Sequence, residues 1–148
     1  MIRNIFIALI LLILCIPLSS LADEDIEFYV IDSGGQSGIN HQMLMVADNA
    51  ETFSHLWMMH TKNQVDPQIM PRIDFTSHMV IGQFLGYSAS CGYQIYTNSV
   101  EFDDGQLEVE SNVVTPVGEI QCLIAETPFE IISVPRLSKL VKFEMEIE

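Results

Sequence analysis

The chain has 148 residues, 49% of them hydrophobic, and its six basic residues stand against 20 acidic ones, which gives a formal net charge of −14. This length suits one domain with a real core. The acidic balance excludes binding to nucleic-acid backbone, or to an anionic membrane surface, through simple charge attraction.

The first 22 residues are typical of a signal peptide. Arg3 precedes an unbroken apolar run over residues 5–14, and Pro17 then ends any helix. Small residues follow, which places a cleavage site between Ala22 and Asp23. The apolar run is too short for a spanning helix, which needs about 20 residues. We therefore expect cleavage.

These features predict one exported domain. Residues 1–22 form the signal peptide, residues 23–148 form the domain, and the mature protein is periplasmic or secreted, without stable insertion in the membrane. A minor alternative is membrane attachment, either through an uncleaved anchor or through lipidation of Cys15, where Leu14 stands in place of the usual small residue.

Alternating and continuous apolar patterns between turn signals predict strands along most of the mature chain. The predicted strands cover residues 26–31, 43–46, 79–85, 92–102, 106–114, 119–126, 129–134 and 140–147. Residues 79–85 form an apolar run and should be the central buried strand. The last strand alternates apolar with charged residues, which is typical of a sheet edge.

One helix is predicted from Asp48 or Asn49 to about Lys62. Glu51 lies three residues after Asp48, as in a capping box, and the apolar side chains that follow are spaced for one helical face. These side chains are Phe53, Leu56 and Trp57. Strands and helix together predict a mainly β fold, an antiparallel β-sandwich or partly open barrel of about eight strands with one packed helix.

Two of the three cysteines, Cys91 and Cys122, lie in the predicted mature domain. In an oxidising compartment an even pair of cysteines favours a disulfide. Two buried thiols are the alternative. A bridge would join the loop after the central strand to a segment about thirty residues later.

Several segments follow one another in a characteristic order: Ser37-Gly38-Ile39, then Phe53 with Leu56-Trp57, then residues 74–86, Gly92-Tyr93, Thr127-Pro128-Phe129 and Val134-Pro135-Arg136. This order resembles the PrcB-like domain family, which is named after an exported subunit of a bacterial surface protease complex. The resemblance covers about residues 26–137. It implies a non-enzymatic accessory or interaction domain. Cys91-Gly92-Tyr93 stands where the family has Gly-Gly-Tyr, and Pro128-Phe129 where it has Pro-Tyr.

No catalytic residue, cofactor or metal site is predicted. The histidines, expected at the surface or half-buried, lack the spacing of metal ligands. The nucleophiles Ser88, Ser90 and Cys91 have no activating base nearby in the sequence. A triad assembled from distant parts of the chain stays open as an alternative. The four histidines are His41, His55, His60 and His78.

The loop after the central strand is the predicted partner-binding site. It is small and polar, and a tyrosine stands at each end. Its candidate residues are Tyr87, Ser88, Ala89, Ser90, Gly92 and Tyr93. Structural roles are the alternative, with Gly92 in a turn and Tyr93 in the core. We expect a protein partner in the envelope or outside the cell, with a protease among the candidates. A second functional hypothesis is a protease inhibitor that inserts its Gly-Tyr loop, as in the chagasin type.

Overall fold

The structure is a computed structural model that describes residues 24–62, 64–103, 105–116, 122–138 and 140–147. The predicted signal peptide and its cleavage site at Ala22 and Asp23 lie outside the described residues. The described elements are β1 (Glu24–Asp25), β2 (Tyr29–Gly34), β3 (Met43–Ala47), α1 (Ala50–Thr61), β4 (His78–Phe84), β5 (Gln94–Asp103), β6 (Gln106–Val114), β7 (Phe129–Pro135) and β8 (Val141–Ile147).

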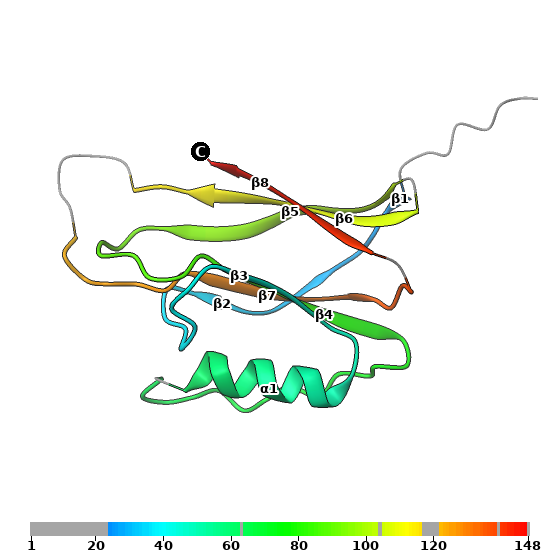
Figure 1. The fold of residues 1–148 in the computed structure, drawn as a ribbon, viewed down its shortest axis with the longest axis horizontal. Helices are drawn as coiled ribbons and strands as arrows, with labels where there is room; N and C mark the ends of the chain where they lie inside the picture. The colour runs from blue at the N-terminus through cyan, green and yellow to red at the C-terminus, as the bar shows by residue number, and fades with distance from the viewer. Residues whose placement is uncertain (1–23, 63, 104, 117–121, 139, 148) are drawn as a thin grey trace, which may run out of the picture.

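These elements form three layers (Figure 1). One four-stranded sheet has the order β2-β7-β4-β3, and a second has the order β1-β5-β6-β8. The two sheets face each other, and α1 covers the outer face of the first. The predicted mainly β sandwich with one packed helix is confirmed, and the sandwich is open, not closed into a barrel.

The central strands of the first sheet, β4 and β7, are buried on both faces. Side chains that point to one face pack under α1, and those that point to the other fill the space between the sheets. The cluster under α1 includes Phe53, Leu56, Trp57, Val80, Phe84, Phe129 and Ile131. This burial explains why both strands lack a clear polar face in the sequence.

Strand β2 starts and ends later than the predicted 26–31, and a bulge lies within it. The pairing with β7 shifts register between Val30 and Asp32. A bulge places neighbouring residues on one side of a strand. Ile31 packs against the cluster under α1, and Asp32 reaches His60 on that helix. The bulge therefore aims a carboxylate at the helix.

Helix α1 has the predicted apolar face, and of the two predicted caps, Asp48 and Asn49, the cap is Asn49. Asn49 has an extended backbone, and its side-chain oxygen accepts the N–H of Thr52 at 2.9 Å. The capping box expected between Asp48 and Glu51 is therefore wrong. The helix buries one residue more than expected, because His60 in its last turn lies fully inside.

Two strand predictions differ from the structure. Within residues 122–126, the described part of the predicted strand 119–126, only Glu126 pairs, in an isolated bridge with Ser88. β8 lies at a sheet edge as expected, but it pairs with β6 in parallel. An alternating pattern specifies which side chains are buried and leaves the direction of the neighbouring strand open.

Gly86 sets the path of the chain out of β4. Its φ is +83°, a conformation that side chains disfavour, and an added Cβ would lie 2.8 Å from backbone atoms of His41 and Gln42. A glycine here lets the chain turn away from β4 while it stays close to the segment before β3. The predicted binding loop follows directly.

Candidate functional site

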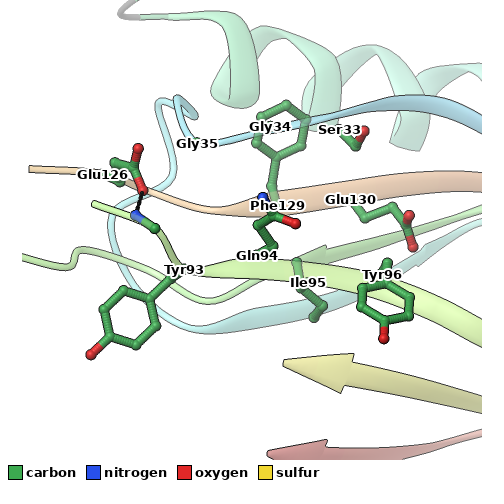
Figure 2. Close-up of a pocket in the computed structure, with 11 residues that line it drawn as sticks. Ser33, Gly34, Gly35, Tyr93, Gln94, Ile95, Tyr96, Glu126, Phe129 and Glu130 are labelled. Atoms are coloured by element: carbon green, nitrogen blue, oxygen red, sulfur yellow. Dashed lines mark hydrogen bonds between the residues drawn. The ribbon is translucent and has the colours of Figure 1, made fainter. Parts of the chain in front are cut away.

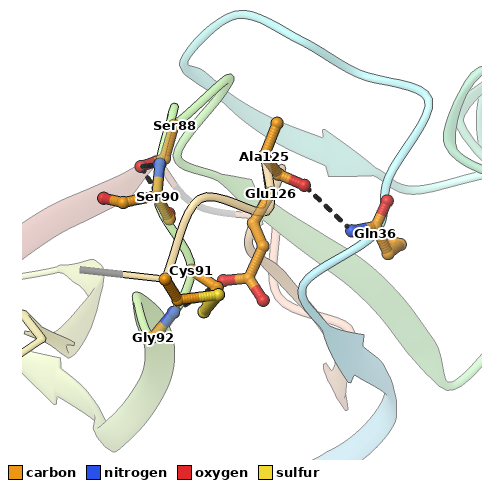
Figure 3. Close-up of a disulfide and its surroundings, with 8 residues drawn as sticks. Gln36, Ser88, Ser90, Cys91, Gly92, Ala125 and Glu126 are labelled. Carbon is orange, nitrogen blue, oxygen red and sulfur yellow. Dashed lines mark hydrogen bonds between the residues drawn. A yellow bond between two sulfur atoms is a disulfide. The ribbon is translucent and has the colours of Figure 1, made fainter. Parts of the chain in front are cut away.

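The predicted disulfide between Cys91 and Cys122 is confirmed. Its sulfur atoms lie 2.00 Å apart and its Cα atoms 5.4 Å apart. The two chain segments run antiparallel around it, since the N–H groups of Ser88 and Glu126 each donate to the other residue's carbonyl, at 2.8 and 2.9 Å. We call residues 87–92 and 122–126 together the disulfide ribbon (Figure 3).

Glu126 joins the two segments of the ribbon through its side chain. Its carboxylate accepts the N–H of Gly92 at 2.9 Å. On its other side lies Gly35, where an added Cβ would stand 3.1 Å from the carboxyl group. The carboxylate is therefore held between two glycines of different loops. Sequence reasoning missed Glu126, because its partners lie more than thirty positions away and no local pattern marks them.

The base of the ribbon is tied to the glycine-rich loop after β2. The Gln36 side chain donates to the carbonyl of Ala125 at 3.2 Å (Figure 3), and the N–H of Thr127 donates to the carbonyl of Gly35 at 2.7 Å. The Thr127 hydroxyl accepts the N–H of Ser37 at 2.6 Å and donates to its carbonyl at 2.7 Å. Hydrogen bonds and a covalent bond thus hold the ribbon at several points, which gives it little freedom to rearrange.

The ribbon exposes large apolar side chains. Tyr87 is 65% exposed on one strand, and Leu123 and Ile124 are 88% and 65% exposed on the other. Such side chains on a well-held loop are typical of a contact surface for another molecule. The sequence does not indicate Leu123 and Ile124 as contact residues, because the pattern of residues 119–126 predicts a strand of the sandwich.

The predicted loop residues divide into two groups. Tyr87 and Ala89 are exposed, and Ser88 folds back so that its hydroxyl donates to the carbonyl of Ser90 at 2.9 Å. Gly92 has a φ of +99°, and Tyr93 is half-buried. The Tyr87 side of the loop is thus free to meet a partner. Gly92 and Tyr93 instead line a cavity.

This cavity of about 350 Å³ lies between the ends of the two sheets (Figure 2). Its walls come from the end of β2, the start of β5 and the start of β7, with Glu126 toward one end and Glu130 toward the other. Tyr93 and Tyr96 also line the cavity, and their rings point away from the two carboxylates (Figure 2). The cavity therefore borders the ribbon and has two carboxylates in its wall.

A second arrangement joins a serine, a histidine and an aspartate from distant parts of the chain. His60 Nδ1 lies 3.0 Å from the Ser37 hydroxyl, and His60 Nε2 lies 3.0 Å from an Asp32 oxygen. The residues are those of a hydrolytic triad. The sequence leaves such an assembly open but does not indicate these residues, because no local pattern marks the bulge in β2 that directs Asp32 toward His60.

The position of this triple limits its chemistry. His60 is 0% exposed and Ser37 is 8% exposed, and the imidazole packs 4.2 Å from the Phe129 ring, centroid to centroid. The Ser37 hydroxyl also accepts the N–H of Ile39 at 3.1 Å. A nucleophile has to reach its substrate, and the burial of Ser37 and His60 prevents this. The hydrogen bonds of the triple instead hold the glycine-rich loop against α1 and β2. The expectation that His60 is half-buried or at the surface is wrong, because its ring completes the core under α1.

Burial lowers the pKa of His60, and the hydrogen bond to Asp32 opposes that shift only in part. The folded protein then binds a proton at His60 less readily than the unfolded chain, whose histidine has a pKa of about 6.5. As pH falls below about 6.5, the unfolded state takes up the proton first. We expect the free energy of unfolding to decrease by up to about 1.4 kcal/mol per pH unit until the pKa of the folded state is reached.

Urea unfolding at pH 7.5, 6.5 and 5.5 measures this effect. His60→Gln should flatten the pH dependence across this interval, whereas His55→Gln, at an exposed position of the same helix, should retain it. Equal pH dependence in the two variants would show that His60 does not carry the linkage.

Comparisons with known proteins were made by family model, by curated sequence and by solved structure. None of the three found a match. In the described ranges no helix is long and apolar enough to span a membrane, and no group of three or more His, Cys, Asp or Glu residues could hold a metal ion.

Proposed function

We propose that this chain is an exported, non-enzymatic accessory domain that binds another envelope or secreted protein through the disulfide ribbon. One observation carries the proposal: a covalently tied ribbon presents Tyr87, Leu123 and Ile124 to solvent. A surface that is already ordered loses little conformational freedom on binding, so more of its contact energy appears as affinity. Tyrosine in particular is enriched among the residues that dominate binding in protein interfaces.

Other observations support the individual parts of the proposal. Disulfides persist in oxidising compartments, which favours export, in agreement with the predicted signal peptide. The burial of Ser37 and His60 argues against a hydrolytic role for their triple. The order of segments that resembles the PrcB-like domain family implies the same kind of accessory domain, and it places a protease among the candidate partners.

The chagasin-type inhibitor is a weaker proposal. That mechanism needs a Gly-Tyr loop that can enter an active-site cleft. Here the N–H of Gly92 is engaged by Glu126, and Tyr93 is half-buried at the cavity. These contacts favour recognition through Tyr87 and the 122–126 segment over insertion of the Gly92-Tyr93 pair.

Affinity capture tests the proposed surface. The tagged, oxidised chain is incubated with envelope and secreted fractions, beside a ribbon variant with Tyr87→Ser, Leu123→Ser and Ile124→Ser. We expect a stoichiometric protein partner on the unaltered chain and binding at least about tenfold weaker on the ribbon variant, because truncation of even one interface hot spot costs roughly 2 kcal/mol or more.

A matched control separates the ribbon from exposed apolar surface in general. Val65→Ser with Ile69→Ser removes two apolar side chains that are 104% and 93% exposed in the segment after α1. This variant should capture the partner normally. A partner held equally well by the ribbon variant would contradict the proposal. Inhibition of papain-like or subtilisin-like proteases by micromolar chain would establish the inhibitor function instead.

A further inference from the structure

Glu130 is a nearly buried carboxylate in the wall of the cavity beside the ribbon. It is 4% exposed and points from β7 into the space between the sheets. One oxygen, Oε2, accepts both the backbone N–H and the hydroxyl of Thr97, each at 2.6 Å. The N–H is available because β1 pairs with β5 only at Glu101 and Phe102, which leaves the strand edge unpaired at Thr97.

A chain of buried hydrogen bonds leads to this carboxylate. The Ser111 hydroxyl donates to the Gln83 side-chain oxygen at 2.9 Å, and the Gln83 amide donates to the Thr97 hydroxyl at 3.0 Å. The Thr97 hydroxyl then donates to Glu130. Every donor in this series of hydrogen bonds points toward the carboxylate. Hydrogen bonds that are aligned in this way polarise one another. The network therefore stabilises a negative charge on Glu130.

This charge has no cationic partner among the described residues. The ion pairs found in those ranges involve Asp32, Asp48, Glu108 and Glu144. The second oxygen of Glu130, Oε1, has no hydrogen bond within the described chain. Every fully buried side-chain oxygen of the described residues has a hydrogen-bond partner. Because Oε1 has none, it is not fully buried, and it is accessible from the cavity that Glu130 lines. Buried charges in proteins are normally paired, because an isolated one is costly.

We propose that this cavity receives an arginine side chain of the protein partner, with the guanidinium group against Glu130 Oε1. The inference rests on the proposed function, since the same partner contacts the ribbon. A guanidinium group is planar, is always charged and pairs well with carboxylates through its fixed set of N–H donors. The net charge of −14 attracts a basic segment, and about 350 Å³ accommodates a side chain.

The test uses N-acetyl-arginine amide as the probe and follows the backbone amide signals of the full chain by NMR at low salt. N-acetyl-citrulline amide has nearly the same shape without the charge. We expect the arginine probe to shift the signals of Thr97, Ser33 and Gly92 in a saturable way, and the citrulline probe to bind at least about tenfold more weakly, because charge-assisted hydrogen bonds are the stronger ones.

Variants locate the interaction. Glu130→Gln keeps the shape and removes the charge, and it should weaken binding of the arginine probe at least about tenfold. Asp103→Asn removes one charge from the exposed far end of β5 and should leave binding unchanged. Equal binding of the arginine and citrulline probes to the unaltered chain would overturn the inference without any variant. Equal loss in both variants would also overturn it, since it would indicate attraction by net charge alone.

The outcomes also separate this inference from the proposed function. A captured partner that binds the Glu130→Gln variant as tightly as the unaltered chain leaves the ribbon proposal standing and rejects the arginine site. A saturable arginine site with no captured protein supports the cavity and rejects the ribbon proposal.

Discussion

Replacement of His60 by Ala should lower the free energy of unfolding by about 3–5 kcal/mol, as is typical when a large core side chain is truncated or a buried pair is broken. The ring is 0% exposed and packs against Phe129, Phe84 and Trp57. Its loss leaves a cavity under α1 and removes the closer partner of the Asp32 carboxylate, whose other oxygen accepts from the Gln68 side chain at 3.5 Å. Urea unfolding at pH 7.5, followed by far-UV circular dichroism, measures the change.

His55→Ala is the matched control on the same helix. His55 is exposed, so its truncation should change stability by no more than about 0.5 kcal/mol. A loss below about 1 kcal/mol for His60→Ala would contradict the view that the Ser37-His60-Asp32 triple locks the glycine-rich loop. Ser37→Ala, which removes one member of the triple, should cost about 1–3 kcal/mol.

Loss of the Cys91–Cys122 disulfide should lower the free energy of unfolding by about 3–4 kcal/mol, because the crosslink closes a loop with a sequence separation of 31 residues in the unfolded chain. The double variant Cys91→Ser/Cys122→Ser should retain its far-UV spectrum, since both cysteines lie outside the named strands. Thermal unfolding of the variant and of the unaltered chain, with and without reductant, measures the effect.

Reductant should destabilise the unaltered chain and leave the double variant unaffected. A double variant as stable as the oxidised chain would contradict the structural role of the bond. The loss of the crosslink should also weaken partner capture, because the ribbon would have to be ordered on binding. That second effect links the stability of the ribbon to its proposed function.

Much of the fold is predictable from local patterns. The apolar runs of β4 and β7 mark strands that are buried on both faces, and the spacing of Phe53, Leu56 and Trp57 marks the helical face. Leu107 and Val109 alternate with charged residues along β6 as a half-buried strand requires. Each of these signals lies within a few residues of sequence.

The site depends on contacts that local patterns do not contain. Glu126 meets Gly92 across 34 positions, and Glu130 meets Thr97 across 33. The bulge in β2 directs Asp32 toward His60. No glycine or proline lies at the bulge itself, so no local pattern predicts it. Among the long-range contacts of the site, the sequence predicts only the one between the cysteines, because the chemistry of an oxidising compartment favours a bridge whatever the distance along the chain.

Site-specific photo-crosslinking tests the central claim most directly, which is that the disulfide ribbon is the protein-binding surface. A photoreactive phenylalanine analogue is placed at position 124 on the ribbon, or at the exposed position 98 on β5. The chain is then illuminated in the presence of envelope and secreted fractions. The account predicts a one-to-one protein adduct from position 124 and none from position 98. An adduct from position 98 alone, or none from position 124, would contradict it.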